Sequence, residues 1–176
     1  MRLALAAALC ALPLAALAAS DDDFPPKQTK TSTECTDGQV WDEKSKTCTD
    51  PKSGALDNDT RYRAVRELAW AGRPDDALHV LSAMTEGDTD RVLTYKGFAH
   101  RKADRLEEGL AWYDAALTAN PDNLLARSYL GQAYVLMGEI ALAQAQLDQI
   151  RARGGAGGWP ETSLETAIAT GQTYNY

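Results

Sequence analysis

The feature that most constrains this chain is an internal repeat, because residues 91–121 and 125–155 carry the same signature. The first copy reads Leu93-x-x-Lys96-Gly97-x-x-His100, then Gly109-x-x-x-Tyr113 and Pro121. The second reads Arg127-x-x-Leu130-Gly131-x-x-Tyr134, then Ala143-x-x-x-Leu147. A weaker copy lies upstream at Ala64-Val65-x-x-Leu68 and Ala77-x-x-x-Leu81. Self-similarity at such a fixed spacing indicates a fold built by stacking one structural unit.

Each copy predicts two helices packed against each other. Leu93, Gly97 and His100 recur at four and then three residues, which places them on one helical face. The small residues leave room for a partner helix to come close. Such a pair cannot bury its apolar face alone, so about three stacked pairs are needed for stability. The predicted helices span residues 58–71, 74–84, 89–102, 105–119, 122–137 and 139–152.

In these residues the chain resembles the tetratricopeptide repeat family, over residues 58–153, with repeats at 58–89, 90–123 and 124–153. The resemblance implies an all-α solenoid of about three antiparallel helix pairs. In that family the first helices line a concave groove that holds a segment of a partner protein. By analogy, the partner-binding groove would contain Tyr62, Arg66, Arg91, Thr94, Phe98, Arg101, Ser128 and Gln132.

The expected groove has a distinct chemistry. Phe98, an aromatic residue at a groove position, is suited to be a binding hot spot. Arg66, Arg91 and Arg101 stand in an otherwise acidic chain, which predicts an acidic or carboxylate-bearing partner segment. Family members that bind chaperone tails clamp a carboxylate with paired Lys and Asn. Asn is missing at the matching places, so that function is not expected here.

The C-terminal part, residues 154–176, predicts a hinge followed by a capping helix. The Gly-rich run 154–158 lacks the Gly-Lys-Ser/Thr ending of a phosphate-binding loop and is followed by Trp159 and Pro160. We therefore interpret the run as a flexible hinge. The helix would carry Leu164, Ala167 and Ile168 on one face and end at Gly171, and it would cover the open end of the third repeat, with Trp159 as its anchor.

The N-terminal stretch, residues 1–19, has the pattern of a bacterial-type secretory signal peptide. Arg2 precedes an Ala- and Leu-rich apolar stretch, and Ala16-Leu17-Ala18 is a small-x-small cleavage signal. The stretch is too short to span a membrane comfortably, so no stable membrane insertion is expected. Removal of Arg2 leaves 17 basic and 25 acidic residues, a net charge of 17 − 25 = −8. The sequence thus predicts an exported protein, periplasmic or secreted.

Residues 20–57 predict a flexible segment that holds one small hairpin. Cys35 and Cys48 would remain after signal cleavage, and an even pair in an exported protein is most simply a disulfide. Metal binding is the alternative, but no His or second Cys pair stands nearby. The enclosed stretch resembles the last hairpin of the peritrophin-type chitin-binding domain, a six-cysteine family. Trp41 is then either a sugar platform or an aromatic that packs the hairpin.

Catalytic chemistry is not expected. Neither His79 nor His100 has a second His or a Cys three or four residues away, so the sequence predicts no metal site, no cofactor and no enzyme. The acidic charge disfavours nucleic acid, despite a local cluster of Arg61, Arg63 and Arg66. The predicted function is a non-enzymatic adaptor or scaffold in the cell envelope, with a protein or peptide as partner. The alternative is a glycan-associated envelope protein that uses the Trp41 hairpin. Homo-oligomerisation is left open.

Overall fold

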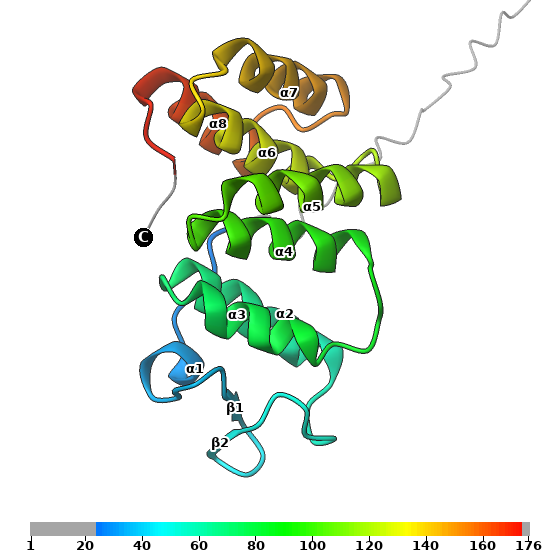
Figure 1. Ribbon diagram of the computed structural model, residues 1–176. Helices are drawn as coiled ribbons and strands as arrows, with labels where there is room; N and C mark the ends of the chain where they lie inside the picture. Colours follow the sequence, from blue (N-terminus) through cyan, green and yellow to red (C-terminus); the bar gives the residue numbers. More distant parts are fainter. Residues whose placement is uncertain (1–23, 174–176) are drawn as a thin grey trace, which may run out of the picture.

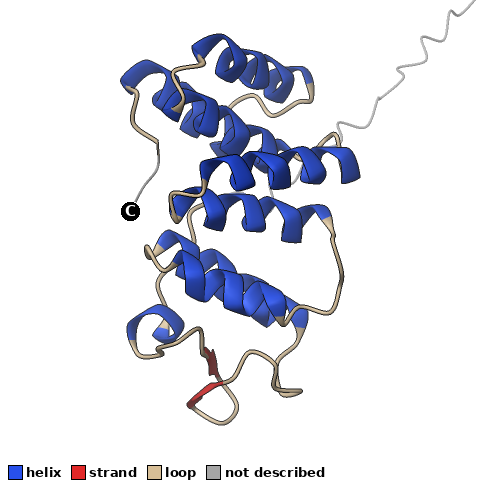
Figure 2. Cartoon of the chain, in the orientation of Figure 1, coloured by secondary structure: helices blue, strands red, loops and turns tan. Residues whose placement is uncertain are grey.

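Helices dominate the structure, a computed structural model that describes residues 24–173 (Figures 1 and 2). The predicted signal peptide, residues 1–19, lies outside the described residues. A mostly helical fold with one disulfide hairpin is confirmed. Among residues 24–173, no helix is both long and apolar enough to cross a membrane.

Six helices form where the repeat pattern predicts them, with ends that differ by no more than two residues. They are α2 (Asn58–Trp70), α3 (Pro74–Ser82), α4 (Asp90–Lys102), α5 (Leu106–Ala119), α6 (Leu124–Leu136) and α7 (Ile140–Ala152). Local chemistry sets several ends. The side chains of Asp57 and Asn123 accept hydrogen bonds from Thr60 N and Ala126 N and so cap α2 and α6. Gly72 and Gly138 follow α2 and α6 with positive φ.

Each helix packs first on its neighbour in sequence, giving the pairs α2–α3, α4–α5 and α6–α7 (Figure 1). The first helices also pack on one another, α2 on α4 and α4 on α6. The predicted capping helix exists as α8 (Trp159–Thr170) and continues this row by packing on α6. We call α2, α4, α6 and α8 the inner row. The helices α3, α5 and α7 lie outside it.

Glycines set how closely the helices approach. A Cβ on Gly97 would lie 2.6 Å from ring carbons of Tyr113, and a Cβ on Gly109 would lie 3.0 Å from the Gly97 carbonyl oxygen. The expected close crossing of α4 and α5 is therefore present. Gly131 has a different neighbour, because its added Cβ would meet Leu164 of α8 at 2.6 Å. The absence of a side chain at Gly131 thus allows the capping helix α8 to pack closely on α6.

The core follows the inner row. Its largest cluster joins aromatic rings from four helices, α2, α4, α5 and α6, and Phe98 lies 4.6 Å from Tyr129 and 5.8 Å from Trp70 between ring centres. A second cluster joins α6, α7 and α8 around Leu147, Ile150 and Leu164. Rings of α4 thus contact rings of both α2 and α6, so side chains fill the space between successive first helices.

The N-terminal segment contains α1 (Lys30–Thr33) and a hairpin of β1 (Val40–Asp42) and β2 (Thr47–Thr49). The strands are antiparallel, with Trp41 opposite Cys48. The predicted disulfide between Cys35 and Cys48 is present.

This segment is docked on α2 and α3, which corrects the expected flexible tether. Arg73 Nη1 donates to Cys35 O at 2.8 Å, and Arg61 Nε donates to Pro51 O at 2.6 Å. Val40 and Leu56 are buried in the core cluster of the first helices. A polar composition predicts a flexible segment only when no other part of the protein binds its main chain. Here two arginines of the helical domain donate hydrogen bonds to main-chain carbonyls of the segment.

The Gly-rich run before α8 is a packed turn. Gly154 and Gly157 have φ of 80° and 79°, and a Cβ on Gly155 would meet Ile150 at 2.7 Å and Leu124 at 2.9 Å. The Gly157 amide donates to Glu161 Oε2 at 2.6 Å. Glycine is needed here for positive φ and for close approach, so its presence does not signal the hinge that composition alone suggested.

Candidate functional site

The eight residues expected in a partner groove lie along the inner row, and most of them are buried. Seven of them have 5% of their surface exposed or less, and Arg91 is the exception, with 33% of its side chain exposed. The seven are Tyr62, Arg66, Thr94, Phe98, Arg101, Ser128 and Gln132. By their surroundings the eight residues fall into four groups: three polar residues near helix contacts, two aromatic residues, one ion-paired arginine and two buried arginines.

Two of these residues, Ser128 and Thr94, make polar contacts between neighbouring inner helices, and Gln132 bonds to Ser128 within α6. The Ser128 and Ser163 hydroxyl oxygens lie 2.9 Å apart across α6 and α8, and Gln132 Nε2 donates to Ser128 Oγ at 3.3 Å. Asn123 Nδ2 donates to Thr94 Oγ1 at 3.2 Å. The residues predicted for the groove are spaced by three or four positions and so share one face of each helix. In this fold that face packs in part on the next inner helix.

Two aromatic residues belong to the ring cluster. Phe98 is 1% exposed, and its ring also lies 5.7 Å from that of Tyr95. Tyr62 meets Tyr95 edge to face at 5.5 Å. The residues predicted for the groove do not include Tyr95, Tyr129 and Trp70, although Tyr95 and Tyr129 occupy the same position in successive repeats, which is a visible signal. These rings hold the inner helices together.

Arg91 is neutralised by carboxylates. It forms ion pairs with Glu86 and with Asp59, the latter at 2.9 Å, and its guanidinium lies 4.8 Å from the centre of the Tyr62 ring. The hydrogen bonds that Arg91 donates to the Glu86 carboxylate raise the pKa of Arg91, and the same contact lowers the pKa of Glu86. Arg91 therefore contributes little positive charge to the inner row.

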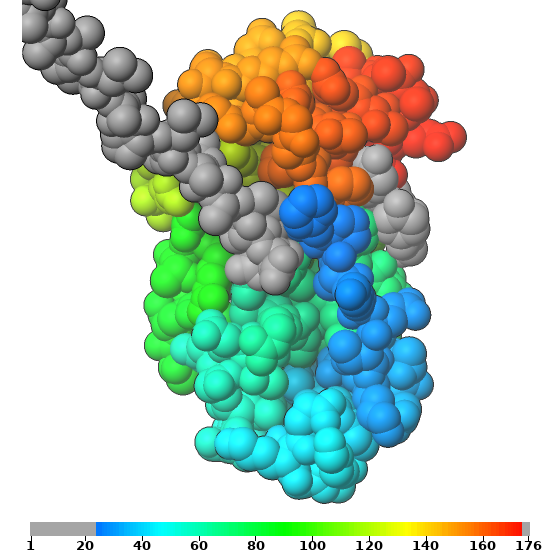
Figure 3. All heavy atoms as spheres, turned by 180° about the vertical axis from the view of Figure 1, so that it is seen from behind, coloured from blue at the N-terminus to red at the C-terminus, as the bar shows by residue number. Residues whose placement is uncertain are grey.

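Arg66 holds the chain's own N-terminal stretch. Its Nε donates to Tyr95 Oη at 3.3 Å, and its Nη2 donates to Phe24 O at 2.6 Å. The carboxylate of the next residue, Glu67, accepts hydrogen bonds from Thr29 N at 2.6 Å and Thr29 Oγ1 at 2.7 Å. Residues 24–29 have no regular secondary structure, and Figure 3 shows them in blue crossing from the neighbourhood of α8 to the side of α2.

Arg101 is buried, and within residues 24–173 its guanidinium forms no ion pair. It is 4% exposed, its Nε donates to Tyr113 Oη at 3.3 Å, and its guanidinium carbon lies 5.2 Å from the Phe98 ring centre. Both Nη1 and Nη2 are buried, and no atom of the described residues accepts a hydrogen bond from them. Burial, and then the charge of Arg101, lower the pKa of the adjacent Lys102 to about 8. Two cationic side chains thus crowd the C-terminal end of α4.

We use the name inner face for Arg66, Trp70, Phe98, Arg101 and Trp159. Trp70 links the set, because its ring stacks on Phe98 and lies 6.2 Å from Trp159, at the start of α8. The inner face therefore combines aromatic rings with two buried guanidinium groups, a composition suited to anions and to extended polypeptide.

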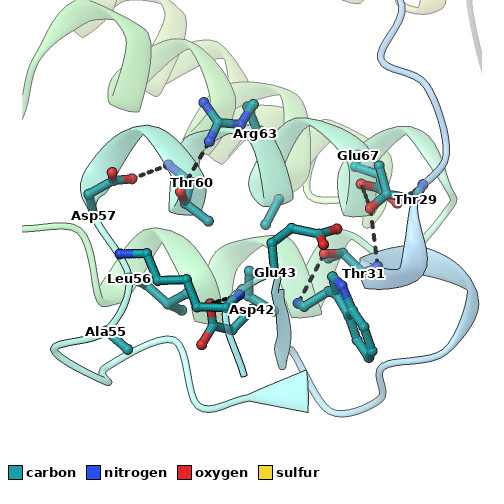
Figure 4. Close-up of a pocket in the computed structure, with 14 residues that line it drawn as sticks. Thr29, Thr31, Asp42, Glu43, Ala55, Leu56, Asp57, Thr60, Arg63 and Glu67 are labelled. Atoms are coloured by element: carbon teal, nitrogen blue, oxygen red, sulfur yellow. Dashed lines mark hydrogen bonds between the residues drawn. The ribbon is translucent and has the colours of Figure 1, made fainter. Parts of the chain in front are cut away.

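A separate cavity of about 360 Å³ lies between the hairpin and α2 (Figure 4). Its wall includes Trp41, Asp42, Glu43, Arg63 and Glu67. The ammonium group of Lys30 lies 4.3 Å from the centre of the Trp41 ring and so covers one face of it. Hydrogen bonds from Ser45 and then Lys44 lower the pKa of Asp42, which keeps a carboxylate at this cavity.

The described residues offer no cluster of three or more His, Cys, Asp or Glu side chains that could hold a metal. His100 Nδ1 lies 3.0 Å from Glu108 Oε2, at the surface end of α4, and Arg105 Nε donates to the same nitrogen at 3.1 Å. The ring of His79 packs close to Gly38, in the turn that precedes β1. Both histidines thus have structural neighbours.

The chain matches no protein-family model, and no curated protein or solved structure is significantly similar to it.

Proposed function

We propose that this protein is an exported, non-enzymatic interaction module of the tetratricopeptide type, which binds a segment of a partner protein on its inner face. The sequence repeat and the stacked helix pairs support the comparison with that family. The disulfide supports export, because such bonds persist in oxidising compartments. In this proposal the protein acts as an adaptor or scaffold in the cell envelope.

The observation that carries the proposal is the contact of the inner face with an extended stretch of polypeptide. Arg66 binds a main-chain carbonyl of residues 24–29, and the adjacent Glu67 binds a main-chain amide. Contacts to the main chain do not depend on one particular sequence, so the same two side chains suit an extended segment of another protein. In the described structure the chain's own segment takes this place.

A peptide titration tests the proposal. The probe is a labelled synthetic peptide of residues 20–29, and the receptor is a protein that begins at Gln28 and so lacks the preceding residues of the segment. We expect saturable binding to the shortened protein and at least tenfold weaker binding to the protein of residues 20–176, because the tethered copy competes.

Two variants serve as controls for this titration. Arg66→Met removes the donor to the carbonyl and is expected to weaken binding, whereas Arg63→Met changes an exposed arginine on the same helix and is expected to leave it unchanged. If a shortened protein with a native circular dichroism spectrum does not bind the peptide, the inner face is not a peptide site.

The second candidate is glycan binding at the Trp41 cavity. It is favoured by the position of an aromatic ring beside acidic and basic side chains in one hollow (Figure 4). The test is retention of the intact protein on insoluble chitin and on peptidoglycan. Loss of retention in Trp41→Ala, but not in Trp112→Ala on the outer helix α5, would support it. Equal passage of all three proteins would exclude it.

A further inference from the structure

Arg101 is an exception to the way folded proteins treat buried charge. Buried charged groups are almost always paired, because removing an ion from water costs several kcal/mol in proteins. Arg101 has 4% of its surface exposed, and the only hydrogen bond described for it joins Nε to Tyr113 Oη. Nη1 and Nη2, which carry four of the five N–H donors of a guanidinium, have no partner in the part of the chain that the structure describes.

Among residues 24–173, the Arg101 guanidinium contacts aromatic rings and forms no ion pair with a carboxylate. The guanidinium lies against Phe98, and the ring of Trp70 stacks on the same phenylalanine. The Tyr113 hydroxyl is a neutral partner, because burial raises the pKa of Tyr113 above its ordinary value. By contrast, Arg91 at the other end of α4 meets two carboxylates. Within the described residues, the same helix thus has one arginine that is neutralised and one that is not.

We propose that the Nη1 and Nη2 edge of Arg101 is the anion contact of the inner face and that it takes a carboxylate of the partner segment. This inference rests on the proposed function and names the chemistry of the ligand. The planar guanidinium matches the two oxygens of a carboxylate in a bidentate pair. One carboxylate balances the charge of this guanidinium, and the flanking rings exclude water, which strengthens the pair.

The first test uses acetate as a probe for the carboxylate. Thermal unfolding of residues 20–176 is followed in sodium chloride and in sodium acetate at constant pH and ionic strength. We expect the Tm to rise saturably with acetate, by about 5 °C at ten times the dissociation constant. Arg101→Met is expected to abolish the rise, and Lys52→Met, at an exposed position outside both candidate sites, to preserve it.

The starting stability of Arg101→Met gives a second readout. If Arg101 carries an unpaired charge until an anion binds, Arg101→Met removes that buried charge and keeps a side chain of similar length. The Tm in chloride is then expected to stay equal or rise. A purely structural arginine predicts a fall in Tm. A lower Tm in Arg101→Met together with an equal acetate response in both proteins would overturn the proposal.

A measurement on the unmodified protein covers the case in which the variant does not fold. The ¹⁵N-detected Nε–Hε resonance of Arg101 is expected to shift saturably with acetate, while that of Arg91 stays fixed because its carboxylates are already bound. No shift at Arg101 overturns the proposal, and a larger effect of inorganic phosphate than of acetate overturns the choice of a carboxylate. Because acetate needs no peptide, a failed peptide titration with a positive acetate response would remove the proposed function alone.

Discussion

Single atoms decide how closely neighbouring helices approach one another. Where Gly97 and Gly109 face each other, the two helices approach until a carbonyl and a ring occupy the places that side chains would need. Where Tyr129 lies, a phenol is enclosed by other rings, with its hydroxyl oxygen 3.5 Å from that of Tyr95.

Gly97→Ala is expected to destabilise the protein although alanine favours helices. The added methyl group would lie 2.6 Å from Tyr113, and overpacking of this kind costs about 1–3 kcal/mol, against about 1 kcal/mol gained in helix propensity. Urea unfolding should show a net loss of about 1 kcal/mol. Gly54→Ala is the control, because nothing lies within 4 Å of its added Cβ, and it should change stability by less than about 0.5 kcal/mol. Equal stability of the two variants would contradict the close crossing.

Tyr129 is expected to make the fold sensitive to alkali. Burial, and then the neighbouring Tyr95, raise the pKa of Tyr129 well above 10.0, so the folded state keeps a proton that the unfolded state loses. This contribution to stability is complete below pH 10 and is lost as the pH rises further, by up to about 1.4 kcal/mol per pH unit. Tyr129→Phe should show a shallower fall in unfolding free energy above pH 10, with pH 8 as the reference. Parallel curves for both proteins would refute the assignment.

At the scale of elements, one carboxylate helps to hold the N-terminal segment on the first helix pair. Glu67 is 5% exposed and accepts three hydrogen bonds from Thr29 and Ser32, at the start of α1. The disulfide then holds the far side of the same segment, since Cys35 follows α1 and Cys48 lies in β2. The segment is thereby part of the fold of α2.

Glu67→Gln is expected to loosen α1 and residues 24–29 without unfolding the helix pairs. Replacement of the carboxylate by an amide weakens charge-assisted hydrogen bonds that together contribute about 2 kcal/mol. Hydrogen exchange of the Ser32 amide should accelerate about 30-fold, while amides in the middle of α6 keep their protection. Glu107→Gln, on the exposed side of α5, is the control and should change neither. Unchanged exchange at Ser32 would show that other contacts hold the segment.

At the scale of the molecule, the last helix reaches back to the first. Trp159 begins α8, which packs on α6 and α7, yet its ring lies 6.2 Å from Trp70 at the end of α2. In an open stack of repeats each unit meets only its neighbours, and unfolding proceeds from the ends. A contact between the first and last inner helices favours unfolding of all the pairs together.

Trp159→Ala is expected to break this cooperativity. In the unmodified protein, denaturant transitions measured by circular dichroism and by tryptophan fluorescence should coincide. In the variant we expect them to separate, with α8 lost at lower denaturant and total stability reduced by about 3 kcal/mol. Trp112→Ala, on outer helix α5, should lower stability without separating the two transitions. Coincident transitions in Trp159→Ala would mean that the contact with Trp70 does not make α2 and α8 unfold together.

The sequence by itself determined the helices. Helix ends depend on local chemistry, such as the cap at Asp57 and the positive φ at Gly138, and the repeat spacing records which faces are apolar, so both can be read without a structure. The Cys35–Cys48 bond was equally readable, because the chain has no other cysteine after the predicted signal peptide.

Only the tertiary structure decided what each polar residue in those helices does. Arg91 and Arg101 occupy one helix and look alike in the sequence, but Glu86 and Asp59 reach the first, and no carboxylate of residues 24–173 pairs with the second. In the same way, composition marked residues 20–57 as a tether, and the arginines that bind part of this segment come from positions further along the chain. The physical reason is that charge pairing and backbone satisfaction depend on groups distant in sequence, which only the packing of the helices brings together.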